Sequence, residues 1–274
     1  MSSTQCNLRL AEAAVNHVAT VMAKVGPANR PEHVRRLVPW AGPNPNYDAD
    51  VAAMGQQLQV AVDGQRTFLD PSLNTVAQKT RMLWGPSERD RVQAALRVAG
   101  HIEHTGLGNC GEQSFVAFKY LLATGATGVA IVNWMSCNHM FVVVGMEADY
   151  GESKASLDQP PAWGAHAVVC DPWFHEWFSI HSQIDPEHAG NVHATNPAGL
   201  REWHRKMKRI LAETRPNLRG NLDRTAAVAA GPDAASAYEE SMAALGTFQV
   251  KLYVAHTSKD FVHLAKSAQP GLIR

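Results

Sequence analysis

The sequence carries no excess of charge of either sign, since 25 Lys and Arg balance 25 Asp and Glu among its 274 residues. A net charge near zero argues against a protein whose main task is to bind nucleic acid or an anionic membrane. Cysteine is scarce too, with four residues at positions 6, 110, 137 and 170. Four dispersed cysteines are too few for a disulfide scaffold, so we interpret them as mostly free thiols in a reducing compartment.

Long hydrophobic runs are also missing. The longest, Phe141–Met146, has the length of a strand, whereas a membrane span needs about 18 or more apolar residues. The first ten residues lack the basic start and the continuous apolar stretch of a secretory signal. We therefore expect no membrane span, and a protein that is cytoplasmic in the producing cell or secreted into a host cell as an effector.

The composition is that of a globular protein, because 45% of the residues are hydrophobic and only 18% are charged. Apolar residues at helical spacing predict a series of helices: Leu8–Val25, Pro31–Val38, Ala49–Val62, Pro71–Trp84, Pro86–His101 and Asn109–Thr124. The last is the best marked, since Asn109 and Glu112 have the spacing of a capping box and Gly125 follows as a stop signal.

Segments rich in Val, Ile and aromatic residues follow and predict strands: Val129–Trp134, His139–Met146, Ala165–Cys170, Trp173–Ile180 and Gln249–Ala255. The polar segment Glu147–Trp163 predicts a surface connection and a candidate lid. Leu200–Ala212 predicts a basic helix, and the Ala-rich segment Thr225–Gly246 is partly loop. The fold class is α+β, with a helical N-terminal region at 1–100 and a core at 101–274 in which a helix packs on a mostly antiparallel sheet, or one continuous domain.

Cys110 lies in the segment Gly-Asn-Cys-Gly-Glu at the start of the best-marked helix. Free backbone N–H groups and the positive end of the helix dipole favour a thiolate at such a position. The flanking Gly108 and Gly111 leave the sulfur open to a substrate. A free cysteine is commonly just a small buried hydrophobic residue, but this context favours a nucleophile.

His139 begins an apolar strand, from which its imidazole can reach a helix N-terminus and exchange a proton with a thiol. Asp171 ends another apolar strand, where a carboxylate can accept the imidazole N–H and fix its tautomer. Taken alone, each residue suits a structural role better than a catalytic one, as a buried histidine or as part of an Asp-Pro turn. Together with Cys110 they supply a nucleophile, a base and an orienting group.

This order, with Cys110 on a helix start and His139 and Asp171 on strands, resembles the papain-like and transglutaminase-like cysteine enzymes. The resemblance covers about residues 108–180, and the Cys-Gly-Glu form looks most like bacterial effector cysteine proteases and protein-glutamine deamidases. It implies a papain-like or transglutaminase-like core and a covalent acyl-enzyme at Cys110, with His139 as base and acid and Asp171 orienting it. It implies no cofactor and no metal.

The chain also departs from these families. The Cys-Gly-Ser-Cys-Trp signature of papain is absent, and no Gln stands a few residues before Cys110 to complete an oxyanion hole. The backbone N–H of Cys110 and the side chain of Asn109 are the substitutes that we expect. No aromatic residue follows Cys110 directly, as it often does in transglutaminases, which argues against crosslinking.

Other residues allow rival interpretations. His101 and His104 share a helix face near Cys110 and would suit zinc, but no Cys-x-x-Cys or His-Glu-x-x-His motif completes such a site. Cys137 lies too close to His139 along the chain to be its nucleophile, so we expect it to line the pocket.

Three further features have structural alternatives. Helix capping is sufficient to explain Glu112, and Trp173 and Trp177 suit either a cleft wall or the core. We interpret the basic helix as a solvated face first and a partner-binding surface second; its charged and titratable residues are Arg201, His204, Arg205, Lys206, Lys208 and Arg209.

The sequence therefore predicts a cysteine-dependent hydrolase that attacks an amide of a protein substrate, either a peptide bond or a Gln side chain, through a thioester. Acyl transfer or crosslinking by the same residues is one alternative. A non-catalytic partner-binding protein with a relic triad is the other.

Overall fold

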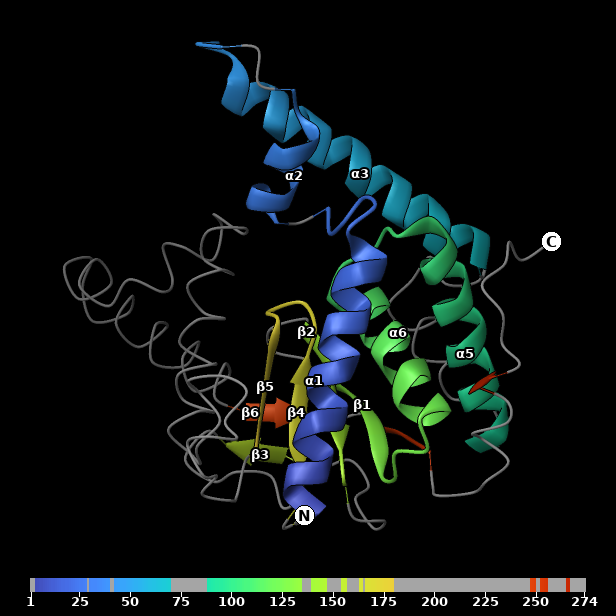
Figure 1. Ribbon diagram of the computed structural model, residues 1–274. Coiled ribbons are helices and arrows are strands. Elements are labelled where there is room, and N and C mark those ends of the chain that lie inside the picture. Colours follow the sequence, from blue (N-terminus) through green and yellow to red (C-terminus); the bar gives the residue numbers. More distant parts are fainter. Residues whose placement is uncertain are drawn as a thin grey trace, which may run out of the picture.

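The computed structural model describes residues 3–28, 30–39, 42–69, 88–134, 139–146, 154–156, 163–164, 166–179, 247–249, 252–255 and 265–266. The helices are α1 Ser3–Met22, α2 Pro31–Leu37, α3 Tyr47–Leu69, α5 Glu88–Thr105 and α6 Cys110–Ala123. The strands are β1 Val129–Trp134, β2 His139–Val144, β3 Lys154–Ser156, β4 Val168–Asp171, β5 Glu176–Ser179, β6 Thr247–Gln249 and β7 Leu252–Ala255. The fold is α+β, as expected, with the helices concentrated in the N-terminal part (Figure 1).

The main sheet has five strands in the order β5-β4-β2-β1-β7, and every neighbouring pair is antiparallel. β3 and β6 form a separate two-stranded antiparallel sheet. The central strand β2 is buried at all but one residue, and β4 is buried throughout. Side chains at the ends of β2 and β4 are therefore brought together inside the protein.

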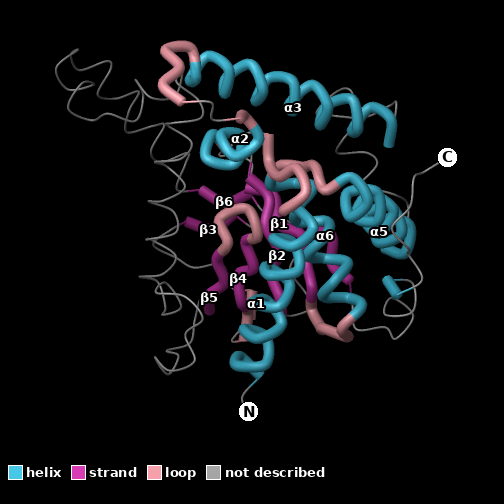
Figure 2. Tube along the Cα trace, turned by 45° about the horizontal axis from the view of Figure 1, so that its top comes forward, coloured by secondary structure: helices cyan, strands magenta, loops and turns pink. Residues whose placement is uncertain are grey.

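Three helices form a layer against the main sheet (Figures 1 and 2). α6 packs on β1 and β2, α1 packs on β4 and β5, and α5 packs on α6 and β7. The buried residues of these helices and of the sheet form one continuous hydrophobic cluster. That cluster runs across residue 100, because α1 and α5 contribute to it together with α6 and the strands.

α1 illustrates why these segments are helical. Its buried residues recur three or four positions apart, so one stripe faces the sheet and α6; they include Leu8, Ala11, Val15, Val18 and Met22. The helix begins at Ser3, earlier than the predicted Leu8, because Thr4 and Asn7 are also buried. Thr4 Oγ1 lies 2.8 Å from His166 Nδ1, and Asn7 Nδ2 donates to the His166 carbonyl at 2.9 Å.

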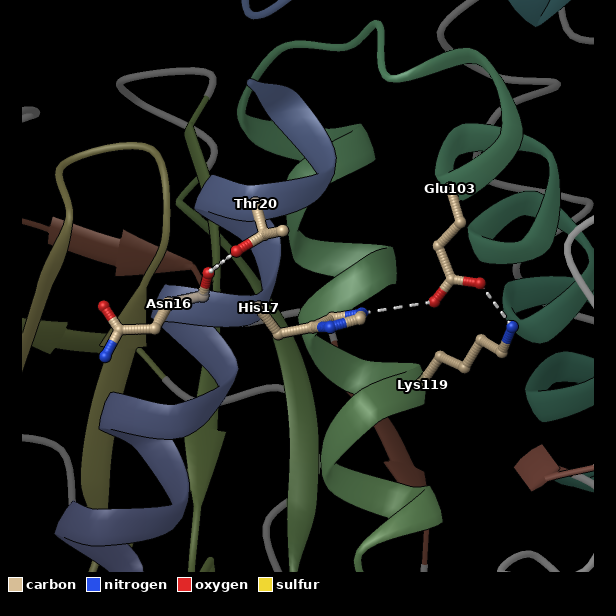
Figure 3. A network of polar contacts seen from close by, with 5 residues as sticks. All are labelled: Asn16, His17, Thr20, Glu103 and Lys119. Carbon is tan, nitrogen blue, oxygen red and sulfur yellow. Dashed lines mark hydrogen bonds and ion pairs between the residues drawn. The ribbon is translucent and has the colours of Figure 1, made fainter. Parts of the chain in front are cut away.

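A polar network joins the three helices of the layer (Figure 3). Lys119 of α6 donates to Glu103 of α5, with Nζ 2.5 Å from Oε2, and His17 Nε2 of α1 lies 3.5 Å from Glu103 Oε1. The His17 ring also stacks on Tyr120 at 4.7 Å between centroids. Because the Lys119 and Glu103 side chains are about nine-tenths buried, we regard this network as the polar link that sets how the helices pack.

Several predicted elements are confirmed with shifted ends. Pro31–Val38, Ala49–Val62, Pro86–His101 and Asn109–Thr124 correspond to α2, α3, α5 and α6. Pro71–Trp84, Leu200–Ala212 and Thr225–Gly246 lie outside the described residues. In the described part of the chain, no helix is both long and apolar enough to cross a membrane.

Two predictions about strands and one about a connection need correction. Trp173 lies in the turn 172–175 and not in the predicted strand Trp173–Ile180, because Pro172 interrupts pairing and β5 begins only at Glu176. Gln249–Ala255 is not one strand, since β6 pairs with β3 whereas β7 pairs with β1. The connection Glu147–Trp163 contains β3 and ends on the fully buried Trp163, so it is not surface throughout.

Candidate active site

Cys110 is the first residue of α6 and is partly exposed, whereas most of the helix that follows is buried. A capping box fixes this helix start, with the Asn109 backbone N–H donating to Glu112 Oε2 at 2.9 Å. Gly108 makes that contact possible, because a Cβ there would lie only 2.3 Å from the Glu112 Cβ. The thiol is thus presented by a rigid turn that tolerates no side chain at position 108.

The α1–α2 connection holds the α5–α6 loop, residues 106–109, from one side. Gly26 and Leu107 form a parallel bridge, and the Gly26 N–H donates to the Gly106 carbonyl at 3.1 Å. The Ala28 N–H donates to Asn109 Oδ1, also at 3.1 Å. The residue that caps α6 is therefore fastened to a segment about 80 positions earlier in the chain.

α3 also holds this loop in place. Gln65 Nε2 donates to the Leu107 carbonyl at 3.2 Å, and Asn109 Nδ2 donates to Gln59 Oε1 at 3.0 Å. Both polar atoms of the Asn109 side chain are therefore engaged within the protein. Its expected part in an oxyanion hole stays a prediction, and the backbone N–H of Cys110 remains the other expected donor.

His139 and Asp171 meet at one end of two neighbouring inner strands, where β2 begins and β4 ends. His139 Nε2 lies 2.7 Å from Asp171 Oδ2, and the two side chains are 3% and 0% exposed. The second oxygen, Oδ1, accepts the Phe174 N–H at 3.2 Å. Both carboxylate oxygens are thus engaged, which fixes the orientation of Asp171.

The register of the sheet explains why these two residues meet. Cys170 pairs with Val142, so the antiparallel register continues to place Asp171 opposite Phe141. Alternate residues of a strand share one face, so His139 and Phe141 lie on the same face. Asp171 therefore reaches the imidazole diagonally from the neighbouring strand.

Cys110 completes a row of three interacting side chains. Burial lowers the pKa of His139, but the charge and hydrogen bond of Asp171, followed by the hydrogen bond and charge of Cys110, raise that pKa to about 10. With Nε2 engaged by Asp171, Nδ1 is the ring nitrogen left for the thiol. The structure thus brings together Cys110, His139 and Asp171, the three residues that the sequence singled out.

Aromatic rings enclose the imidazole. Trp173 and Phe174 lie 5.4 Å from His139 between ring centroids, and Phe141 lies 6.1 Å away. Trp173 is buried, so it both packs beside the site and forms part of the hydrophobic core. Such cover keeps water from the His139–Asp171 pair and strengthens their attraction.

Other cysteines differ from Cys110 in their surroundings. Cys6 is exposed, and Cys170 is buried with its Sγ 3.6 Å from the Ala11 carbonyl. Burial and then the charge of Asp171 raise the pKa of the Cys170 thiol well above its ordinary value. Cys137 lies outside the described residues, as does the basic helix predicted after it.

The rival zinc interpretation finds no cluster to support it in the part of the chain that the structure describes. Among the described residues, no group of three or more His, Cys, Asp or Glu side chains has an arrangement that could hold a metal ion. His101 is buried and His104 is exposed, although both lie on α5. Glu112 caps α6, and Trp177 is a buried residue of β5.

Sequence reasoning missed Arg30, Gln59 and Phe174. Arg30 lies over Trp173, Gln59 holds Asn109, and Phe174 donates its N–H to Asp171. None belongs to a motif with a recognisable spacing, and each acts through a contact distant in sequence or through its backbone.

Comparisons with known proteins give no relative for this arrangement. No family model, no curated protein and no solved structure matches the chain.

Proposed function

We propose that this protein is a cysteine-dependent hydrolase that cleaves an amide of a protein substrate. One observation carries the proposal: the imidazole of His139 interacts with Cys110 on one side and with Asp171 on the other. A thiol, a base and a buried orienting carboxylate in a row are what nucleophilic catalysis by cysteine requires. The position of Cys110 at a helix N-terminus supports the same role.

In the first step, the Cys110 thiolate attacks the amide carbonyl carbon and forms a C–S bond. The raised pKa of His139 favours the imidazolium, which donates its proton to the leaving nitrogen as the C–N bond breaks. The products of this step are a free amine, or ammonia, and a thioester at Cys110. The charge of Asp171 stabilises the imidazolium throughout.

In the second step, water resolves the thioester. His139, now neutral, takes a proton from the water, whose oxygen attacks the thioester carbonyl. The C–S bond breaks, a carboxylic acid leaves, and the thiolate–imidazolium pair is restored. One water is consumed in each cycle, and no cofactor or redox partner is needed.

The order and placement of these residues support a kinship with the papain-like and transglutaminase-like enzymes. In the proposed assignment α6 is the nucleophile helix, and β2 and β4 carry the base and the orienting acid. Peptide hydrolysis and Gln deamidation share this chemistry, and they differ in whether the leaving group is a peptide amine or ammonia.

The first test is thiol reactivity at neutral pH. Iodoacetamide should label Cys110 faster than Cys6, although Cys6 is more exposed, and it should leave the native Cys170 unlabelled. The His139→Gln variant should slow labelling of Cys110 alone, and Cys6 serves as the internal control. Equal rates at Cys110 and Cys6 would contradict an activated thiolate.

The second test identifies the reaction. Bacterial and host-cell extracts are treated with the wild type, with Cys110→Ala and with the control Cys6→Ala, and are then analysed by mass spectrometry. New peptide termini that require Cys110 but not Cys6 indicate proteolysis, and a gain of about one dalton on Gln indicates deamidation. The absence of any Cys110-dependent product would favour a non-catalytic binding protein.

A further inference from the structure

Arg30 connects the start of α2 to the turn that carries the candidate acid. Its guanidinium carbon lies 5.2 Å from the centroid of the Trp173 ring, and its NH1 donates to the Trp173 carbonyl. Its Nε also donates to Glu32 Oε1 at 2.5 Å. With 18% of its side chain exposed, Arg30 holds both the ring and the backbone of Trp173.

The turn that Arg30 grips, residues 172–175, contacts both members of the buried pair. The Trp173 ring lies 5.4 Å from His139, and the next residue, Phe174, donates its N–H to Asp171 Oδ1 at 3.2 Å. The turn also contains His175 with a φ of 58°, a left-handed conformation that costs a residue other than glycine about 1–2 kcal/mol. A strained turn needs external contacts to keep one conformation.

We infer that Arg30 is a positioning residue, which holds Trp173 over His139 and thereby keeps the His139–Asp171 pair dry and aligned. The inference rests on the proposed function, because it assigns Arg30 to that catalytic apparatus. The planar guanidinium suits the task, since it stacks on an indole while donating to a carbonyl. A lysine at position 30 would keep a positive charge near the ring but lacks the planar group with several N–H donors.

Two effects of removing Arg30 have opposite signs, which makes the inference testable. The loss of a positive charge alone raises the pKa of a neighbouring histidine. Loosening Trp173 instead admits water to the His139–Asp171 pair. Water relieves the burial that lowers the pKa of His139, but it also weakens the interactions with Asp171 and Cys110 that together outweigh burial, so the pKa falls from about 10 toward its ordinary 6.5. The charged groups that act on the pKa of His139 are Asp171 and Cys110. If Arg30 is a positioning residue, the entry of water must therefore outweigh the loss of its charge, and the pKa of His139 must fall.

The experiment is a titration of the histidine rings by NMR in the full chain, with the His139 signal assigned from its loss in His139→Gln. In Arg30→Met, the pKa of His139 should fall by about one unit or more, and Arg30→Lys should restore part of the loss. His33 provides an internal reference, because burial and then the charge of Arg30 lower its pKa in the wild type. In Arg30→Met the pKa of His33 should therefore rise while that of His139 falls.

Glu32→Gln is the matched control, since it removes the other partner of Arg30 and should leave His139 unchanged. An unchanged or raised pKa of His139 in Arg30→Met would overturn the inference. If Arg30→Met does not fold, the smaller change Arg30→Lys decides, because it too must lower the pKa of His139. The titration measures no turnover, so its outcome is independent of whether Cys110 proves to be a nucleophile.

Discussion

The imidazole of His139 and the carboxylate of Asp171 form a hydrogen-bonded pair, 2.7 Å from Nε2 to Oδ2, that is closed to solvent. Removing two charged groups from water costs several kcal/mol for each, and their attraction does not reliably recover that cost. A chain that maintains such a pair beside a partly exposed thiol has a pattern typical of functional sites. Because the pair titrates, it should also make the stability of the protein depend on pH.

Stability should fall as pH rises above neutrality. The pKa of His139 is raised from an ordinary 6.5 to about 10, with burial opposing and the charge of Asp171 producing the shift. A raised pKa gives stability that is fully present below pH 6.5 and is lost as pH approaches 10. Urea unfolding at pH 6, 8 and 10 should therefore show a progressive decrease in the free energy of unfolding.

Asp171→Asn is the control for this pH dependence, because it retains the size of the side chain and removes its charge. Without that charge, burial lowers the pKa of His139 and only Cys110 opposes it, so most of the loss of stability between pH 6.5 and 10 should disappear. The same slope in the wild type and in Asp171→Asn would show that other groups cause it.

Gly108→Ala should destabilise the protein. The new Cβ would lie 2.3 Å from the Glu112 Cβ, so the capping box of α6 must open, at a cost of about 1–3 kcal/mol. Gly64→Ala is the matched control, because its Cβ meets nothing within 4 Å on helix α3. That change should stabilise the protein by about 0.5–1 kcal/mol, and thermal unfolding of both variants measures the contrast.

Lys119→Met should destabilise the protein by about 3–5 kcal/mol, because it leaves the buried Glu103 carboxylate without its cation. Adding Glu103→Gln should recover much of the loss, since the uncompensated charge is then gone. Chemical denaturation of the single and double variants gives both values. A single variant within about 0.5 kcal/mol of the wild type would mean that the Lys119–Glu103 pair does not stabilise the helix layer.

The same network predicts weakening in acid. Burial raises the pKa of Glu103, but hydrogen bonds from His17 and Lys119 and their charges outweigh it and lower the pKa below 4.5. The associated stability is present above pH 4.5 and is lost as pH falls through the lowered pKa. Glu103→Gln should therefore show a smaller loss of stability below pH 4.5 than the wild type.

Variants of Asn109 and Gln59 distinguish two roles for Asn109, which are to hold the α5–α6 loop and to donate to an oxyanion. If Asn109 serves by fastening the α5–α6 loop, Gln59→Leu should reduce turnover about as much as Asn109→Ala does, because it removes the Nδ2 contact. If Asn109 donates to an oxyanion, Asn109→Ala should cost about 10²–10³-fold in kcat while Gln59→Leu has little effect. Steady-state kinetics on the substrate found by mass spectrometry distinguish them.

Local signals in the sequence determined the secondary structure that carries the site. The Asn-x-x-Glu pattern located the start of α6, and the Val-rich segment His139–Met146 located β2 with His139 as its first residue. These signals depend on neighbours a few positions apart, so backbone propensity and capping decide them. They were enough to select Cys110, His139 and Asp171 as a set.

Such local patterns do not predict contacts between residues that are far apart in the sequence. Gln249–Ala255 alternates as one strand should, but tertiary pairing divides it between two sheets. The contacts of Arg30 with Trp173 likewise join residues 143 positions apart.

The sequence by itself therefore determined which side chains stand at the start of α6, the start of β2 and the end of β4. Only the tertiary structure decided that these three ends meet, that both oxygens of Asp171 are engaged, and that Asn109 is held by Ala28 and Gln59. The physical reason is that capping and strand formation are local, whereas burial, strand register and pKa depend on everything that packs around a group.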